Sequence, residues 1–181
     1  SGMPFLKISL YAFAHEVFDV ITVITVNHLD TVPGWLNKVL HIIFYGFALL
    51  FIIEFLDYVI NLTRPYKLLR IYRRIKYIPV VILILLSFVL PIDYVEGRGT
   101  NYSYGLIVFC CYGTVALYCI VATLLVVANR KHLDKKMRLA LLPTITLMMI
   151  MGFIQAVIPE VLMTGACATF VCLRLFATID N

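Results

Sequence analysis

Long apolar segments recur along this sequence, and they restrict its fold more than any other feature. The runs hold about 17–25 mostly apolar residues, each enough to cross about 30 Å of hydrocarbon. The 181 residues are 62% hydrophobic and 14% charged, with a mean hydropathy of +0.98, whereas soluble domains are about 45–50% apolar and about 25% charged. We therefore expect a polytopic membrane protein, and the runs are too long and too uniformly apolar for the alternating strands of an outer-membrane barrel.

The expected fold is an all-α membrane helix bundle that forms one domain over residues 1–181. Pro and Gly residues separate the apolar runs, and no connection is long enough to hold a soluble domain. Ser1 and Gly2, before Met3, are interpreted as a protease-site remnant. We predict about six transmembrane helices, at about 5–26, 38–62, 77–94, 104–128, 139–157 and 161–178.

The placement of Lys and Arg predicts the orientation of the bundle. Eleven of the 15 basic residues lie in the links at 64–76 and 130–138. Cytoplasmic loops of membrane proteins carry such an excess. We therefore expect these two links and both termini in the cytoplasm, and a multi-pass protein of the inner membrane. The net charge of +5 then reflects topology, and no soluble basic module indicates a nucleic-acid partner.

The link at 64–76 alternates basic and apolar residues, a pattern typical of a short amphipathic helix on the inner headgroup layer. Membrane lipid is therefore an expected partner, either as a general anchor or as a recognised anionic species.

No motif in the sequence indicates catalysis or a bound cofactor. A Ser–His–Asp arrangement, a phosphate-binding loop and an H-E-x-x-H segment do not occur. We therefore expect neither an enzyme nor a cofactor protein. The cysteines lie inside predicted spans without a C-x-x-C spacing, which favours apolar packing over metal or redox roles: Cys110, Cys111, Cys119, Cys167 and Cys172.

Ionisable residues at membrane depth supply the first candidate site. His15, Glu16 and Asp19 form one polar wedge on the first helix, and Glu54 lies in a second wedge on the next helix. Such groups are costly in lipid and usually face a bundle interior. Because the two helices should pack antiparallel, the four residues are predicted to meet. They could form a structural polar contact, a ligand-binding or proton-sensing site, or a metal site, although the spacing of a tight histidine pair is absent and no metal is assigned.

A second group of candidates lies at the outer rim. Carboxylates, amides and aromatic residues gather around the first loop and the loop before residue 104, as at the mouth of a small-molecule pocket. Interfacial anchoring is the alternative for the aromatic residues. The candidates for ligand binding here are Asn27, Trp35, Asn37, His41 and Tyr104.

The stretch from Ala14 to His41 resembles the N-terminal membrane region of bacterial signalling proteins whose C-terminal part is a diguanylate cyclase (GGDEF) or related domain. The matching pieces are F-D-x-I-T from Phe18, V-P-x-W-L-N from Val32, and Y-S-Y-G from Tyr102. This family often continues the last piece with Pro, whereas Leu106 follows here. The resemblance covers nearly the whole chain, but its motifs are loose and non-catalytic.

The resemblance implies a sensory input module. It implies a further helix before the first predicted one and a cytoplasmic output domain after Asn181, with two-fold output favouring a homodimer. We therefore expect a receptor that perceives a small-molecule ligand or a membrane state and signals through its last helix. The alternative is a small proton-coupled transporter or channel that uses His15, Glu16, Asp19 and Glu54 as a relay.

Overall fold

The computed structural model describes residues 3–63, 66–161 and 163–179, which form seven helices and one hairpin. Ser1 and Gly2, interpreted above as a protease-site remnant, lie outside the described residues, as do Arg64 and Pro65 of the first basic link. The elements in chain order are α1 (Met3–Val26), α2 (Gly34–Thr63), α3 (Tyr66–Ile75), α4 (Ile78–Val89), β1 (Asp93–Val95), β2 (Tyr102–Tyr104), α5 (Leu106–Ala128), α6 (Lys135–Val157) and α7 (Thr164–Ile179).

Four of these helices are long and apolar enough to cross a membrane: α1, α2, α5 and α6. The prediction of a largely helical membrane bundle is confirmed at this level. The other two predicted spans correspond to shorter apolar helices, α4 and α7. With 12 residues, α4 is about 18 Å long at about 1.5 Å per residue, less than the hydrocarbon thickness.

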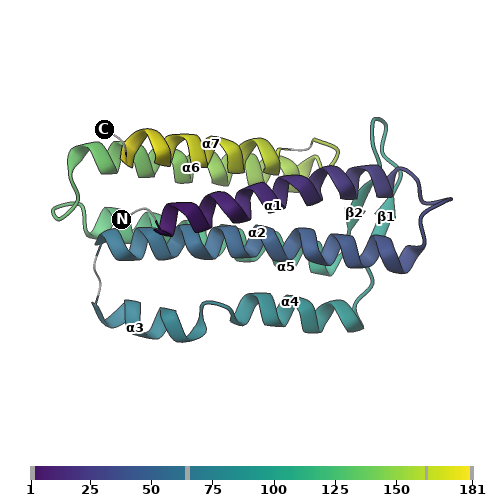
Figure 1. The fold of residues 1–181 in the computed structure, drawn as a ribbon, viewed down its shortest axis with the longest axis horizontal. Helices are drawn as coiled ribbons and strands as arrows, with labels where there is room; N and C mark the ends of the chain where they lie inside the picture. Colours follow the sequence, from purple (N-terminus) through teal and green to yellow (C-terminus); the bar gives the residue numbers. More distant parts are fainter. Residues whose placement is uncertain (1–2, 64–65, 162, 180–181) are drawn as a thin grey trace.

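Five helices form a closed ring, and α2 is its most buried member. Helix α1 packs on α2, α2 on α5, α5 on α6, α6 on α7, and α7 returns to α1, while α4 lies outside the ring against α2 and α5 (Figure 1). Helix α2 contributes the largest share of the buried side chains, including Phe55 and Leu49, and its buried residues lie around most of its circumference. The ring therefore encloses an interior to which five helices contribute side chains.

A two-stranded hairpin covers one end of the ring. Strands β1 and β2 are antiparallel, with Asp93 opposite Tyr104. The predicted helix 77–94 was wrong in its last turn, because Pro91 forces the preceding Leu90 into an extended conformation that ends α4. The predicted helix 104–128 likewise begins later. Gly105, with φ +123°, turns the chain from β2 into α5, and a conformation of this kind favours glycine.

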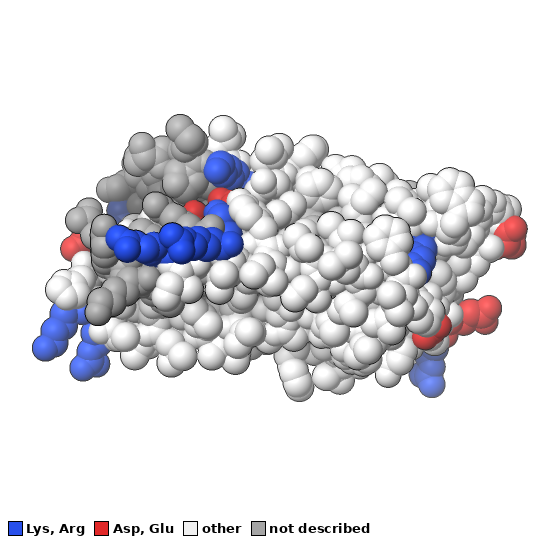
Figure 2. All heavy atoms as spheres, turned by 90° about the horizontal axis from the view of Figure 1, so that it is seen from below, with Lys and Arg blue, Asp and Glu red and all other residues white. Residues whose placement is uncertain are grey.

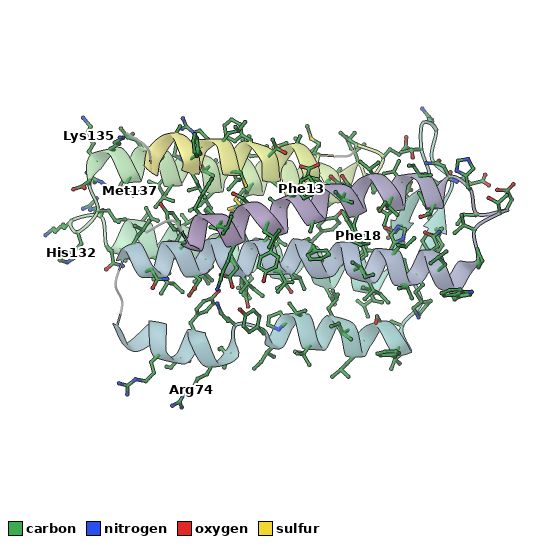
Figure 3. The ribbon with its side chains drawn as sticks, in the orientation of Figure 1. Phe13, Phe18, Arg74, His132, Lys135 and Met137 are labelled. Atoms are coloured by element: carbon green, nitrogen blue, oxygen red, sulfur yellow. The ribbon has the colours of Figure 1, made fainter. Side chains whose placement is uncertain are left out.

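The first basic link contains the predicted short helix, α3, but this helix runs alongside α2 in line with α4 (Figure 1). The hydroxyl of Tyr72 donates a hydrogen bond of 2.7 Å to the carbonyl oxygen of Ile53 in α2. Arg74 points away from the bundle (Figure 3). Helix α3 is therefore attached to α2 at Tyr72, while the exposed side chain of Arg74 points outward.

Three further helix starts differ from the prediction. Helix α2 begins at Gly34 rather than 38. Helix α6 begins at Lys135 rather than 139, so Pro143 lies inside it. Helix α7 begins at Thr164 rather than 161.

Charged residues separate along the long axis of the bundle. Figure 2 shows most of the visible Lys and Arg at one end, then a broad uncharged belt, and at the opposite end Asp and Glu together with a smaller number of basic side chains. The start of α1 and the end of α7 lie at the same end as the α5–α6 link, and the hairpin lies at the other (Figure 1). This distribution is that of a protein with an apolar belt between two polar ends.

Candidate functional site

Two adjacent cavities occupy the interior of the ring. The inner cavity, of about 70 Å³, is lined by all five ring helices, with His15, Tyr45, Tyr112, Met148 and Cys167 among its walls. The outer cavity, of about 40 Å³, lies beneath the hairpin. It is lined by polar and aromatic side chains: Asp19, Thr22, His41, Tyr45, Tyr102, Ser103, Tyr112 and Gln155.

The two cavities share three aromatic side chains, since both are lined by Phe44, Tyr45 and Tyr112. Pockets for drug-sized ligands are about 300–1,000 Å³, so the two spaces in this structure admit only water or a group of a few atoms.

His15 and Asp19 come from successive turns of α1 and line different cavities. The imidazole of His15 stacks on Phe44 with ring centres 4.6 Å apart, and its Nδ1 has no hydrogen-bond partner within the described residues. Asp19 is 8% exposed and lines the outer cavity, not the inner one. A neighbouring ring pair, Phe18 of α1 on Phe47 of α2 at 5.5 Å, holds this part of α1 against α2, whereas Phe13 is exposed (Figure 3).

Glu16 contacts α7 instead of the cavities. Its Oε1 accepts a hydrogen bond of 2.9 Å from the hydroxyl of Thr169. Its carboxylate also lies against Gly165, where any Cβ would collide with it. The absence of a side chain at Gly165 therefore leaves room for the Glu16 carboxylate between α1 and α7.

The expectation that Glu54 joins His15, Glu16 and Asp19 was wrong. Glu54 faces the α3–α4 junction, where its Oε1 lies 3.1 Å from Lys76 Nζ and accepts a hydrogen bond of 3.1 Å from Tyr77. Asp57 lies 3.5 Å from the same ammonium group. Lys76 of the first link therefore lies between the two carboxylates of the second wedge, which α2 presents to the α3–α4 junction rather than to α1.

The outer-rim candidates divide into buried and exposed residues. His41 is buried, shares a hydrogen bond of 2.9 Å with the carbonyl of Asn37, and lies edge-on to Tyr94 at 5.2 Å. Asn37 is fully buried and accepts a hydrogen bond of 2.9 Å from Thr25. Of these residues, His41 lines the outer cavity. Burial raises the pKa of Tyr94, in β1, to about 12, so its hydroxyl stays protonated beside His41.

Three of the rim candidates lie away from the cavities. Trp35 is 69% exposed, and Tyr104 is 46% exposed and packs on Phe109. Asn27 is exposed and donates a hydrogen bond of 2.7 Å to Thr100 in the hairpin loop. Asn27 therefore fixes the hairpin to the end of α1, and it does not line either cavity.

The hairpin is attached to three sides of the ring. Ser103 of β2 shares a hydrogen bond with Tyr45 of α2. In the hairpin loop, the backbone N–H of Asn101 donates to Asn27 Oδ1 at 3.0 Å. The carboxylate of Glu160, in the α6–α7 turn, accepts hydrogen bonds from the backbone N–H groups of Arg98 and Gly99. The cover of the outer cavity is thus connected to α1, to α2 and to the turn that begins α7.

Gln155 connects the outer cavity directly to α7. Its Oε1 accepts hydrogen bonds from the backbone N–H groups of Met163, at 2.7 Å, and Thr164, at 3.0 Å. These N–H groups lie at the start of α7, where no helical carbonyl is available to them. The Gln155 side chain, which lines the cavity, therefore also caps the start of α7.

The sequence reasoning missed the residues that α5 and α6 contribute. Apart from Tyr104, no candidate was drawn from the predicted helices at 104–128 and 139–157, yet Tyr112 and Gln155 line the outer cavity. One sequence feature could have identified this part of the site, because Gln155, the one glutamine of the sequence, lies inside an apolar run. A polar side chain at membrane depth usually faces a bundle interior, as Gln155 does.

The described residues contain no group of three or more His, Cys, Asp or Glu side chains that could hold a metal ion. All five cysteines are free, and Cys111, Cys119 and Cys167 are buried among apolar neighbours.

Comparisons of the chain with family models, with curated proteins and with solved structures found no match.

Proposed function

We propose that this chain is a membrane-embedded sensory module that binds a small polar ligand in the outer cavity and responds through α7. The observation that carries the proposal is the double role of Gln155, which lines the outer cavity and also holds the first N–H groups of α7. A ligand that hydrogen-bonds Gln155 competes with these contacts, so its binding favours one position of α7 over another.

The proposed ligand is a small molecule with hydrogen-bond donors and a partly apolar body. Asp19 supplies an acceptor, the rings of Tyr45 and Tyr112 supply flat apolar walls, and the hairpin covers them. Because the cavity of about 40 Å³ holds only a few atoms, binding requires the hairpin to move outward. Ligand entry and the change at α7 are then coupled, since Glu160 joins the hairpin to the α6–α7 turn.

In the proposed topology the chain crosses the inner membrane of a bacterium about six times, with α4 as the third crossing and α3 at its cytoplasmic end. The separation of charge seen in Figure 2 supports placing the α3 and α5–α6 end in the cytoplasm and the hairpin outside. A cytoplasmic output domain of the diguanylate cyclase type, dimeric and downstream of α7, is the partner that the sequence resemblance favours. The module itself is proposed to be non-catalytic.

A thermal-unfolding screen tests ligand binding. The purified protein in detergent is mixed with amino acids, sugars, nucleosides and small organic cations, and its unfolding midpoint is recorded. A ligand that binds only the folded state raises the midpoint, and the rise grows with the logarithm of its concentration relative to the dissociation constant. We expect one chemical class to do so for the wild type and for Asp30→Asn, an exposed loop residue, but not for Asp19→Asn. A stabilising compound that acts equally on Asp19→Asn contradicts the assigned cavity.

A proton-coupled carrier is the second candidate, because His15 and Asp19 line adjacent cavities that share three aromatic walls. Two of the four proposed relay groups, Glu16 and Glu54, are engaged elsewhere. Proteoliposomes with a pH-sensitive dye distinguish the candidates. A carrier acidifies the lumen under a pH gradient and loses this activity in Asp19→Asn, whereas the sensory module leaves the lumenal pH equal to that of empty vesicles.

A further inference from the structure

A groove outside the ring lies at the basic end of the bundle, where α5 ends and α6 begins. Its volume is about 470 Å³, larger than either interior cavity. Lys135, at the first position of α6, marks this end of the molecule in Figure 3. The groove has no part in the proposed sensory site.

The walls of the groove combine cations with an apolar floor. The cations are Arg130, Lys135 and Arg138, and the floor includes Val126, Leu139 and Leu142. The side chains of Arg130 and Lys135 are exposed, whereas Arg138 is half-buried. The Nε of Arg138 is buried and has no hydrogen-bond partner among the described residues. A buried donor without an acceptor costs about 1–3 kcal/mol, so an anion or a polar oxygen that binds Arg138 Nε in the groove would remove this cost.

The first turn of α6 favours an anion at the same place. The groove borders this turn of the 23-residue helix, where unpaired N–H groups and the helix dipole attract negative charge. Pro143, further along the same helix, lies on the apolar side of the groove.

We propose that this groove binds one anionic phospholipid. The phosphate lies among Arg130, Lys135 and Arg138, and an acyl chain lies along Val126, Leu139 and Leu142. A free phosphate ion would use the rim and leave the floor exposed, whereas an anionic lipid uses both, and the floor continues into the apolar belt that faces the membrane. The proposal rests on the membrane embedding of the chain. The proposed topology places the groove in the cytoplasmic leaflet. The lipid-binding proposal does not depend on the sensory role of the chain.

Native mass spectrometry of the full chain in detergent tests the assignment. The protein is titrated with phosphatidylglycerol, with phosphatidylcholine of the same acyl chains, and with inorganic phosphate. We expect one phosphatidylglycerol adduct at concentrations where neither of the other two binds. The variant K135Q/R138Q should weaken this adduct about tenfold or more, because each basic residue near a lipid surface contributes attraction. The matched control K131Q/K136Q removes two exposed cations of the same link that do not line the groove, and it should bind as the wild type does.

Three results would overturn the proposal. Equal weakening in both double variants means general charge attraction with no site. Equal binding of phosphatidylcholine means an apolar groove without headgroup recognition, and tighter binding of inorganic phosphate than of the lipid means a site for the free anion. If K135Q/R138Q fails to fold, Arg130→Gln replaces it, since this exposed side chain tests the same prediction with a smaller loss. A result here leaves the sensory proposal unaffected, because that proposal is tested at Asp19.

Discussion

Tyr45 of α2 and Ser103 of β2 share a hydrogen bond between their hydroxyl groups, although 58 positions separate them in the sequence. Tyr45 lines both interior cavities, so this contact joins the cover of the ring to the wall between its two spaces. It is one of the contacts that hold the hairpin over the outer cavity.

Tyr45→Phe should loosen the hairpin without collapsing the core. The ring remains, but Ser103 loses its partner, which costs about 1 kcal/mol. Hydrogen–deuterium exchange of the purified protein should speed up across residues 93–104. Tyr104→Phe is the matched control, because Tyr104 is 46% exposed and lines neither cavity. Equal acceleration in the two variants would mean that the hairpin is held by other contacts.

Gly105 and Gly113 should respond to alanine with opposite signs. Gly105 has φ +123°, a conformation that costs an L-residue about 1–3 kcal/mol. Gly113 lies inside α5, where a Cβ would meet nothing within 4 Å, and alanine is the better helix former by about 1 kcal/mol. Thermal unfolding should therefore show a lower midpoint for Gly105→Ala and an unchanged or higher one for Gly113→Ala. Similar midpoints for both variants would contradict the assigned turn.

Thr169→Val should weaken the contact between α1 and α7. Valine keeps the shape of the side chain but cannot donate to Glu16, whose carboxylate then stays half-buried without this donor. The expected loss is about 1–3 kcal/mol of unfolding free energy. Thr123→Val is the control, since the Thr123 hydroxyl bonds only the carbonyl of Cys119 on its own helix. If Thr123→Val lowers the unfolding free energy as much as Thr169→Val does, the hydrogen bond between Thr169 and Glu16 does not provide the expected stabilisation.

The ion pair of Glu54 and Lys76 should show strong coupling in a double-mutant cycle. Lys76→Met leaves Glu54 and Asp57 without their cation in a site where the Glu54 side chain is only 4% exposed. Breaking a buried pair of this kind costs about 3–5 kcal/mol. Glu54→Gln combined with Lys76→Met should therefore lose less than the sum of the single variants. Additive losses, measured by thermal unfolding, would show that the pair is screened by solvent.

The sequence predicted the helical bundle well because membrane-length apolar runs leave little choice of secondary structure. It predicted too long a helix before Pro91, since hydropathy does not register the conformation that proline imposes on Leu90. The hairpin at 93–104 was missed for a related reason. Each strand has only three residues, too few for an alternating pattern to emerge.

The candidate site was predicted in part, and the errors have a common cause. Helical spacing correctly assigned His15 and Asp19 to an interior face of α1. It could not decide that Glu54 turns toward Lys76, because this partner lies at the α3–α4 junction, 22 positions later in the sequence. Tyr112 and Gln155 come from helices whose neighbours depend on closure of the ring. Periodicity on one helix gives the direction of a side chain relative to its own axis, but not the identity of the helix it faces.

Asp19 is the residue through which the central claim is tested most directly. The measurement is native mass spectrometry of the wild-type protein released from its membranes, beside Asp19→Asn and Asp30→Asn prepared in the same way. The account predicts a discrete additional mass of a small molecule on the wild type and on Asp30→Asn, absent from Asp19→Asn. A wild-type protein without bound mass, or a mass that Asp19→Asn retains fully, would contradict ligand binding beneath the hairpin and leave Asp19 as a structural contact between helices.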